Sequence, residues 1–283
     1  MGHFRSRCLA VSLLQLTAVV AFGQEVVTIQ RQDQKAMAIA AYSPKTGNCR
    51  GIAIISPGAG GSEKGYQYLG EGMASLGYLA VVMGHQESGP RAVRERLRGR
   101  DVRAALADLI TDPNAYRGRF LDIATSTQWA HGRCQGTEAV LVGHSMGAAT
   151  AMLEAGARNH LDMSGSDSFG MYVALSPQGA GSIFPANAWS DIKRPVLSLT
   201  GTRDDELQGA SWETRTEPYR NMPVGCKWLG VIDGATHMNL AGLGMARGSE
   251  ELITKVIGAF VDGVRRGDCA APRQVGGIDL RSK

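Results

Sequence analysis

The pentapeptide Gly-His-Ser-Met-Gly at residues 143–147 has the residue types and the spacing that a serine nucleophile requires. An apolar run at residues 139–142 precedes it and a small-residue run at residues 148–152 follows it, which predicts a strand, a tight turn and a helix. In such a turn the serine hydroxyl is exposed, small flanking residues let the backbones approach, and the helix N-terminus favours an anion. Since all three features are present, the pattern indicates that Ser145 is a nucleophile and does more than cap a helix.

A serine hydroxyl is a weak nucleophile until a base takes its proton, so a histidine is required. On a strand–turn–helix frame of this kind the chain order is serine, acid, histidine. Of the six histidines, His160 and His237 follow Ser145, and His160 precedes every candidate acid. His237 lies just after an apolar run, at the end of a predicted strand where catalytic groups collect, and is the predicted base. His85 and His144 are expected to have structural roles.

The acid that orients the histidine should follow the predicted strand at residues 196–200. That strand runs into Gly201-Thr202-Arg203-Asp204-Asp205-Glu206, so three adjacent acids are candidates. Neighbouring residues in a turn point in different directions, and two of the three are expected to be solvated. Residue types alone leave the choice open.

Acyl transfer also needs backbone N–H groups that face the developing negative charge. One is the N–H of Met146, directly after the nucleophile, and the second should come from the glycine-rich loop at residues 56–62. Ala59 is the predicted donor and Gly60 is the alternative. A phosphate-binding loop is rejected because no lysine follows at the required spacing.

Apolar runs alternate with helical patterns along the chain, which predicts a doubly wound α/β fold with a mostly parallel sheet. One long helix is expected to end before Pro113, and residues 117–137 and 178–193 are interpreted as long surface connections. The tail after Cys269 is expected to be loose. The predicted strands lie at residues 25–30, 36–42, 51–56, 79–83, 139–143, 171–176, 196–200 and 228–232, and the other predicted helices at 66–76, 145–157 and 250–265.

The composition is that of an ordinary globular protein: 283 residues, 43% of them hydrophobic, with a formal net charge of +4. The densest basic run, at residues 91–103, contains acids and no aromatic residue, so it predicts a solvated helix face and gives no support to nucleic-acid binding.

Residues 1–23 are predicted to be a signal peptide, because a basic start is followed by an apolar run and the small-residue site Ala21-Phe22-Gly23. The run is shorter than the roughly 20 residues of a membrane-spanning helix, so no stable anchor is expected. The predicted location is therefore secreted or periplasmic.

The predicted domains are a catalytic domain at 24–268 and a C-terminal tail at 269–283. Cys49, Cys134, Cys226 and Cys269 could form disulfides in three connectivities, and none has metal-ligand spacing.

With these motifs in place, residues 36–265 resemble the α/β-hydrolase superfamily, in particular a branch similar to dienelactone hydrolases, platelet-activating-factor acetylhydrolases and cutinases. The segments that carry the resemblance are Ser56-Pro-Gly-Ala-Gly-Gly-Ser62, Ala74-Ser-Leu-Gly-Tyr-Leu-Ala80, Gly143-His-Ser-Met-Gly147, Gly201-Thr-Arg-Asp204 and Gly234-Ala-Thr-His237. The resemblance implies a triad of Ser145, Asp204 and His237, oxyanion donors Ala59 and Met146, no cofactor or metal, and no separate lid domain.

The resemblance has two departures. True dienelactone hydrolases carry cysteine where this chain has Ser145, and many members have His-Gly where this chain has Pro57-Gly58.

The expected activity is cleavage of a small or polymeric carboxylic ester through an acyl-enzyme. The alternatives are a catalytically idle scaffold that acts as a binding protein, and a peptidase. The oligomeric state is left open.

The same fold predicts the disulfides Cys49–Cys134 and Cys226–Cys269. Cys49 and Cys134 come just before two strands that this fold places side by side. Cys226 precedes the last predicted strand, and Cys269 follows the helix that packs near it.

Overall fold

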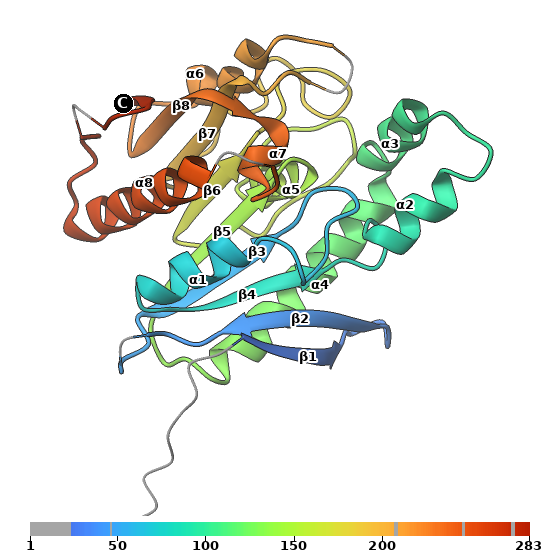
Figure 1. Cartoon of the computed structure of the whole chain (residues 1–283), viewed down its shortest axis with the longest axis horizontal. Helices are drawn as coiled ribbons and strands as arrows, with labels where there is room; N and C mark the ends of the chain where they lie inside the picture. The colour runs from blue at the N-terminus through green and yellow to red at the C-terminus, as the bar shows by residue number, and fades with distance from the viewer. Residues whose placement is uncertain (1–23, 46, 207–208, 245–246, 273–274) are drawn as a thin grey trace, which may run out of the picture.

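The computed structural model describes residues 24–45, 47–206, 209–244, 247–272 and 275–283. The strands of these residues form one nine-stranded sheet (Figure 1). The strand order is β1-β2-β4-β3-β5-β6-β7-β8-β9. Strands β3 to β8 run parallel to one another. Strands β1 and β2 extend one edge of the sheet and β9 extends the other, in antiparallel fashion. The strands are β1 Gln24–Gln30, β2 Ala36–Tyr42, β3 Gly51–Ser56, β4 Tyr78–Gly84, β5 Glu138–His144, β6 Met171–Leu175, β7 Val196–Arg203, β8 Lys227–Thr236 and β9 Ile278–Ser282.

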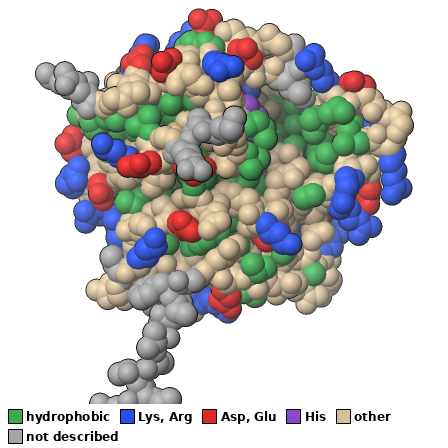
Figure 2. Space-filling model, in the orientation of Figure 1, with side chains coloured by type: hydrophobic (Ala, Val, Ile, Leu, Met, Phe, Trp, Pro, Cys, Tyr) green, Lys and Arg blue, Asp and Glu red, His purple; other side chains and the backbone are tan. Residues whose placement is uncertain are grey.

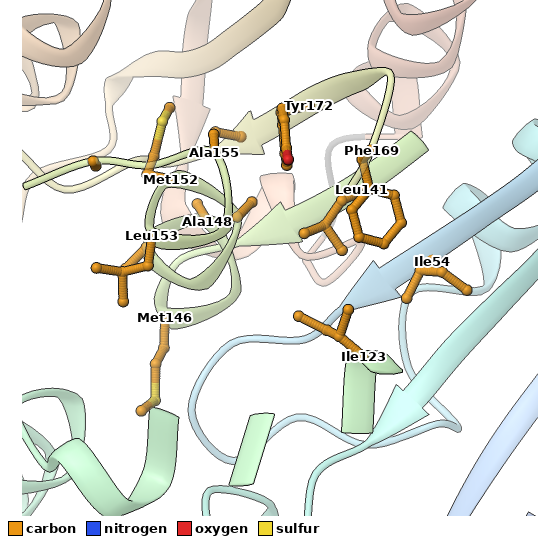
Figure 3. Packing of buried hydrophobic residues seen from close by; sticks show 14 of the residues in the cluster. Ile54, Ile123, Leu141, Met146, Ala148, Met152, Leu153, Ala155, Phe169 and Tyr172 are labelled. Atoms are coloured by element: carbon orange, nitrogen blue, oxygen red, sulfur yellow. The ribbon is translucent and has the colours of Figure 1, made fainter. Parts of the chain in front are cut away.

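Helices cover both faces of this sheet, as strands that are buried at every residue require. Strands β3, β4 and β6 have no exposed position. The helices are α1 Gln67–Ser75, α2 Pro90–Arg96, α3 Val102–Ile110, α4 Pro113–His131, α5 Met146–Glu154, α6 Glu217–Asn221, α7 His237–Leu240 and α8 Arg247–Arg266, with a 3-10 helix η1 at Trp212–Thr216. Helices α1 and α8 share one apolar core with the sheet (Figure 1). Helices α4 and α5 share the other, part of which Figure 3 shows. The predicted doubly wound α/β fold is confirmed.

The expected long helix before Pro113 is wrong in its extent, because two short helices occupy that region. Gly99, with a φ of 68°, lies between α2 and α3 and adopts a left-handed conformation that ends helical hydrogen bonding. The side chain of Asp101 then caps α3 by accepting from the N–H of Ala104. The arginines of this region other than the half-buried Arg96 are exposed, as expected for a solvated face.

The interpretation of residues 117–137 as a surface connection is also wrong. Most of this segment belongs to α4, a 19-residue helix that packs against the sheet. Its buried face carries Arg119, Asp122 and Ser126 in place of a continuous apolar stripe. An apolar period of 3.6 is therefore hard to recognise in this segment.

The expectation of a loose tail after Cys269 is wrong at residues 278–282, which corrects the predicted domain limits. Residues 278–282 form β9, which pairs antiparallel with β8 and completes the edge of the sheet. The catalytic domain therefore extends through this strand.

Both predicted disulfides are confirmed. Cys49 is joined to Cys134 with a Cα–Cα distance of 5.6 Å, and Cys226 is joined to Cys269 with a Cα–Cα distance of 5.0 Å. The first tethers the start of β3 to the segment before β5, and the second tethers the start of β8 to the chain after α8.

The predicted signal peptide, residues 1–23, lies outside the described residues. Within the described part of the chain, no helix combines the length and the apolar character needed to cross a membrane.

Candidate active site

Ser145 lies on the sharp turn between β5 and α5, with the unusual backbone angles φ 54° and ψ −118°. A non-glycine residue in such a conformation is strained and persists only where the surroundings fix it. Gly143 and Gly147 allow the turn, because a Cβ on Gly147 would lie 1.9 Å from the carbonyl oxygen of Ser56 and one on Gly143 would lie 2.0 Å from the carbonyl oxygen of Gly147. The two glycines of the sequence motif are therefore required by close backbone contacts.

Asp204 and His237 meet at the carboxyl ends of β7 and β8. Asp204 Oδ1 and His237 Nδ1 are 2.9 Å apart, and Asp204 is fully buried. Its second oxygen, Oδ2, accepts hydrogen bonds from the hydroxyls of Ser176 at 2.7 Å and Thr200 at 2.9 Å. A buried carboxylate with this many donors is held in one orientation.

The other two candidate acids face away from His237. Asp205 is exposed and accepts from the N–H of Trp212 at 3.1 Å. Glu206 accepts from the hydroxyl of Thr214 at 2.9 Å. Both acids thus organise the segment that follows β7, and neither contacts the histidine.

Arg215 completes the environment of Asp204 and is a residue that sequence reasoning missed. Its Nε lies 3.0 Å from Asp204 Oδ1 and donates to the Asp204 carbonyl oxygen at 2.6 Å. Its Nη1 donates to the carbonyl oxygen of Ser176 at 3.1 Å. Arg215 comes from η1, a short helix with no motif, so nothing in its neighbourhood distinguished it from the other arginines.

His237 is the first residue of α7, and its ring is 32% exposed. Thr236 and Asn239 cap this helix reciprocally, which fixes His237 at the start of the helix. With Nδ1–H donating to Asp204, Nε2 is the nitrogen that can accept a proton. The described residues include no hydrogen bond between Ser145 Oγ and Nε2, a contact that commonly tightens only when substrate binds.

Within the segment 56–62, residues 57–61 form the glycine-rich loop proper, which lies against Ser145. A Cβ on Gly58 would be 3.3 Å from the Cβ of Ser145. The N–H of Gly58 donates to the Tyr66 hydroxyl at 3.0 Å, that of Gly60 to the Ser88 carbonyl at 2.8 Å, and that of Gly61 to the Gly58 carbonyl at 3.0 Å.

Ala59 differs from these neighbours, because its N–H has no hydrogen bond to any described residue. Met146 is the first residue of α5, so its N–H has no partner inside the helix. These are the two predicted oxyanion donors. The alternative donor, Gly60, already uses its N–H on Ser88.

His144 connects the three segments of the site. Its Nδ1 is 2.9 Å from the Tyr66 hydroxyl, and its Nε2 is 3.1 Å from the His237 carbonyl oxygen. Burial, followed by the nearby His237, holds the pKa of His144 well below its usual range, so the ring is neutral. Nε2–H then donates to His237, and Nδ1 accepts from Tyr66, which in turn accepts from the Gly58 N–H. This bridge accords with the expected structural role.

The surface beside the site is apolar. Figure 2 shows a small histidine patch next to a hollow that is flanked by hydrophobic side chains. Met238 and Leu243, which follow His237 in the chain, are 51% and 54% exposed. Within the described ranges, no three histidine, cysteine or acidic side chains are grouped as metal ligands would be.

Comparison with protein families gives one match that spans most of this site. Residues 53–261 match the model of the alpha/beta hydrolase family, and the chain belongs to that family. The predicted resemblance to this superfamily and to its esterase and cutinase-like branch is confirmed.

Two curated relatives are cutinases. Cutinase est2 from Thermobifida alba is 25% identical over 199 residues, which are 69% of this chain and 55% of that protein. Cutinase 2 from Thermobifida cellulosilytica is 25% identical over 198 residues, which are 69% of this chain and 63% of that protein. The matched segment therefore covers less than two thirds of each relative.

Two solved structures share the fold. The esterase domain of a Rhodothermus marinus protein has a TM-score of 0.57 at 13% identity and covers 84% of this chain and 98% of that one. A serine hydrolase without lid from Xanthomonas campestris has a TM-score of 0.54 at 17% identity and covers 88% of this chain and 97% of that one. No separate lid domain interrupts the described residues here either.

Proposed function

We propose that this protein is a serine esterase that cleaves carboxylic esters through an acyl-enzyme. Ser145 is the nucleophile, His237 the general base and Asp204 the acid that orients the base. The N–H groups of Ala59 and Met146 form the oxyanion hole. The chain is a catalyst in this proposal, and the idle scaffold and the peptidase are the alternatives.

The observation that carries the proposal is the pairing of a half-exposed histidine with a fully buried carboxylate. The 2.9 Å contact between His237 Nδ1 and Asp204 Oδ1 leaves Nε2 free to accept a proton. His237 contacts His144, which directly precedes the strained, partly exposed Ser145. A scaffold that only binds has no need of a strained serine, because holding such a conformation costs about 1–3 kcal/mol.

The proposed reaction has two halves. Ser145 Oγ attacks the ester carbonyl while His237 Nε2 takes its proton, and the two backbone N–H groups hold the oxyanion. The C–O bond to the alcohol then breaks, and His237 returns the proton to the leaving alkoxide. Water attacks the acyl-enzyme by the same route and releases the carboxylic acid and Ser145. Asp204 stabilises the imidazolium in both halves.

The proposed substrates are esters with an apolar acyl or alcohol part, small or polymeric. The cutinase relatives and the apolar side chains of Met238 and Leu243 near His237 support this choice. We further propose that the protein is exported, secreted or periplasmic. Two disulfides support export, because structural disulfides persist in oxidising compartments.

Hydrolysis of p-nitrophenyl esters with acyl chains of increasing length tests the activity and ranks substrates. We expect wild-type protein to turn over short and medium chains, and Ser145→Ala to lower kcat by roughly 10⁴–10⁶-fold. Ser190→Ala, which changes an exposed serine on a loop, is the matched control and should retain full activity. A wild-type protein that hydrolyses none of the esters faster than buffer does would favour the idle scaffold.

A further inference from the structure

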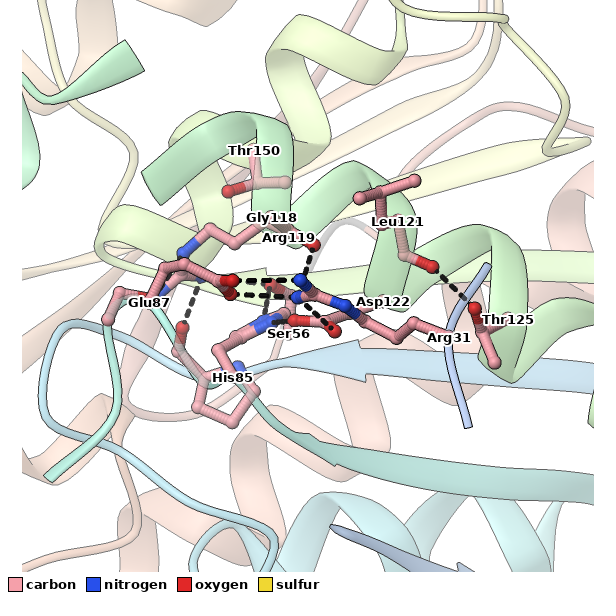
Figure 4. Close-up of polar contacts among 12 residues, drawn as sticks. Arg31, Ser56, His85, Glu87, Gly118, Arg119, Leu121, Asp122, Thr125 and Thr150 are labelled. Carbon is pink, nitrogen blue, oxygen red and sulfur yellow. Dashed lines mark hydrogen bonds and ion pairs between the residues drawn. The ribbon is translucent and has the colours of Figure 1, made fainter. Parts of the chain in front are cut away.

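A second Ser–His–Asp arrangement lies behind the glycine-rich loop (Figure 4). Ser56 Oγ is 2.9 Å from His85 Nε2, and His85 Nδ1 is 2.8 Å from Asp122 Oδ2. Ser56 ends β3, His85 directly follows β4, and Asp122 comes from α4. All three residues are buried, so no substrate can reach this serine.

The direction of each hydrogen bond follows from the charge state of His85. Burial lowers the pKa of His85 to about 4, so the ring is neutral at pH 7. Nδ1–H then donates to Asp122, and Nε2 accepts the hydroxyl proton of Ser56. The Ser56 oxygen itself accepts from Arg119 Nη1 at 3.1 Å. The hydroxyl is thus fixed from both sides.

Arg119 connects this arrangement to the backbone of the glycine-rich loop. The same Nη1 donates to the Pro57 carbonyl oxygen at 2.8 Å, and Nε donates to the Ser88 hydroxyl at 2.9 Å. The Ser88 carbonyl oxygen accepts the Gly60 N–H at 2.8 Å. Arg119 therefore contacts the loop just before Ala59 and, through Ser88, just after it.

The other end of the arrangement is anchored at the edge of the sheet. Asp122 Oδ1 accepts from Arg31 Nη1 at 3.0 Å, and Arg31 also pairs with Glu87 at 2.8 Å and with Asp33. Arg31 directly follows β1 and is almost fully buried. The chain of contacts thus runs from the β1–β2 turn through α4 to the loop beside Ser145.

We propose that Arg119, with Ser56 and His85, positions the glycine-rich loop so that the Ala59 N–H faces the oxyanion. The proposal rests on the esterase function, because it assigns these residues to the oxyanion hole of that reaction. A loop with glycines at positions 58, 60 and 61 has many accessible conformations, and the donor is effective only when held in place before the reaction. A misplacement of about 1 Å can cost ~10²-fold in rate. Arg119, Ser56 and His85 are positioning residues and do not touch the substrate.

Ser56→Ala removes one hydroxyl and is the most conservative test, with Ser126→Ala as its matched control. Ser126 is a buried serine of α4 whose hydroxyl has no hydrogen-bond partner among the described residues. We expect Ser56→Ala to lower kcat by about tenfold with KM within about twofold, and to weaken a trifluoromethyl ketone inhibitor in parallel, since only the tetrahedral state uses the oxyanion hole. The pH at which activity falls on the acid side should not move, because His237 is untouched.

Arg119→Lys and Arg119→Ala extend the test. We expect Arg119→Ala to lower kcat by about 10²-fold, added guanidinium to restore part of it, and Arg119→Lys to lie between. Amide hydrogen exchange of residues 58–61 measures how firmly the loop is held, independently of catalysis, and it should quicken in Ser56→Ala and stay unchanged in Ser126→Ala.

Equal kcat and equal loop exchange in Ser56→Ala and Ser126→Ala would overturn the positioning role. If wild-type protein itself hydrolyses no ester, the esterase proposal fails instead, and loop exchange alone then decides whether these residues hold the loop.

Discussion

The protein contains two sets of serine, histidine and aspartate whose acid–histidine contacts are nearly the same and whose settings are very different. The acid–histidine contact is 2.9 Å at His237 and 2.8 Å at His85. The side chain of His237 is 32% exposed, whereas that of His85 is 1% exposed. Ser145 lies on a strained turn, whereas Ser56 is the last residue of a regular strand. Residue types and the acid–histidine distance therefore do not distinguish the set that we propose as reactive from the buried one, whereas access and backbone geometry do.

Both acids contact a buried arginine, Arg215 at Asp204 and Arg31 at Asp122, but in the described residues the buried set has a further arginine at its serine. Arg215 contacts Asp204, where it holds the acid and leaves Ser145 and His237 open. In the buried set Arg119 donates to the Ser56 hydroxyl oxygen, which occupies a lone pair that an attack on substrate would need. These contacts support the proposed roles, proton transfer for the first set and holding of the backbone for the second.

The largest expected difference concerns the acid. Asp204→Asn should lower kcat by ~10²–10⁴-fold, because the amide no longer fixes the correct tautomer of His237. Asp205→Asn should change kcat by about a few-fold at most, since Asp205 is exposed and only caps the segment at Trp212. Both are measured at saturating ester, with circular dichroism to confirm folding. If Asp205→Asn were the impaired variant, the assignment of Asp204 would be wrong.

Loss of the acid in the buried set, Asp122, should lower the stability of the fold. Asp122→Asn should lower the free energy of unfolding by about 3 kcal/mol, because it leaves Arg31 and His85 buried with one partner fewer. Asp191→Asn, at an exposed pair with Arg158, is the control and should change it by less than about 1 kcal/mol. Urea denaturation measures both. Equal stability of the two variants would show that the buried pairing contributes nothing.

The buried, neutral state of His85 should make the stability of the fold depend on pH. Its pKa is about 4 in the folded protein against 6.5 in the unfolded chain, so the unfolded chain binds more protons between these values. Stability is then complete above pH 6.5 and falls as the pH drops toward 4. We expect His85→Gln to remove about 2 kcal/mol of the loss between pH 7 and pH 4.5. His144, whose pKa is also lowered by burial, should maintain part of the slope. An unchanged slope in His85→Gln would contradict a neutral, buried His85.

The smallest expected effect is at Arg215. Arg215→Lys keeps the charge and loses the fork that contacts both the side chain and the carbonyl of Asp204. We expect kcat to fall by about tenfold with KM nearly unchanged. Steady-state kinetics on the best ester of the chain-length series measures this, and full activity would show that Ser176 and Thr200 suffice to hold the acid.

The candidates Ser145 and His237 could be predicted because each directly follows a strand and the chain order is fixed. Arg215 and Arg119 were missed because they lie inside helices that carry no motif. The three acids after β7 could not be separated by residue type, since burial alone distinguishes Asp204, and the family pattern made the choice.

The missed elements have physical reasons. Helix α4 buries Arg119, Asp122 and Ser126, so the apolar period that marks a helix is interrupted on its inner face. Strand β9 shows a short alternation of Ile278 and Leu280 with charged residues, a strand signal that its position after a cysteine and several small residues obscured.

Labelling with a fluorophosphonate probe compares the two serines most directly. Intact, folded protein is treated with the probe and digested, and the modified peptide is identified by mass spectrometry. We predict one covalent adduct on Ser145, none on Ser56, and no labelling of Ser145→Ala, because only a serine that is both exposed and paired with a base can react. An absence of any adduct on Ser145 in folded protein, or an adduct on Ser56, would contradict the account.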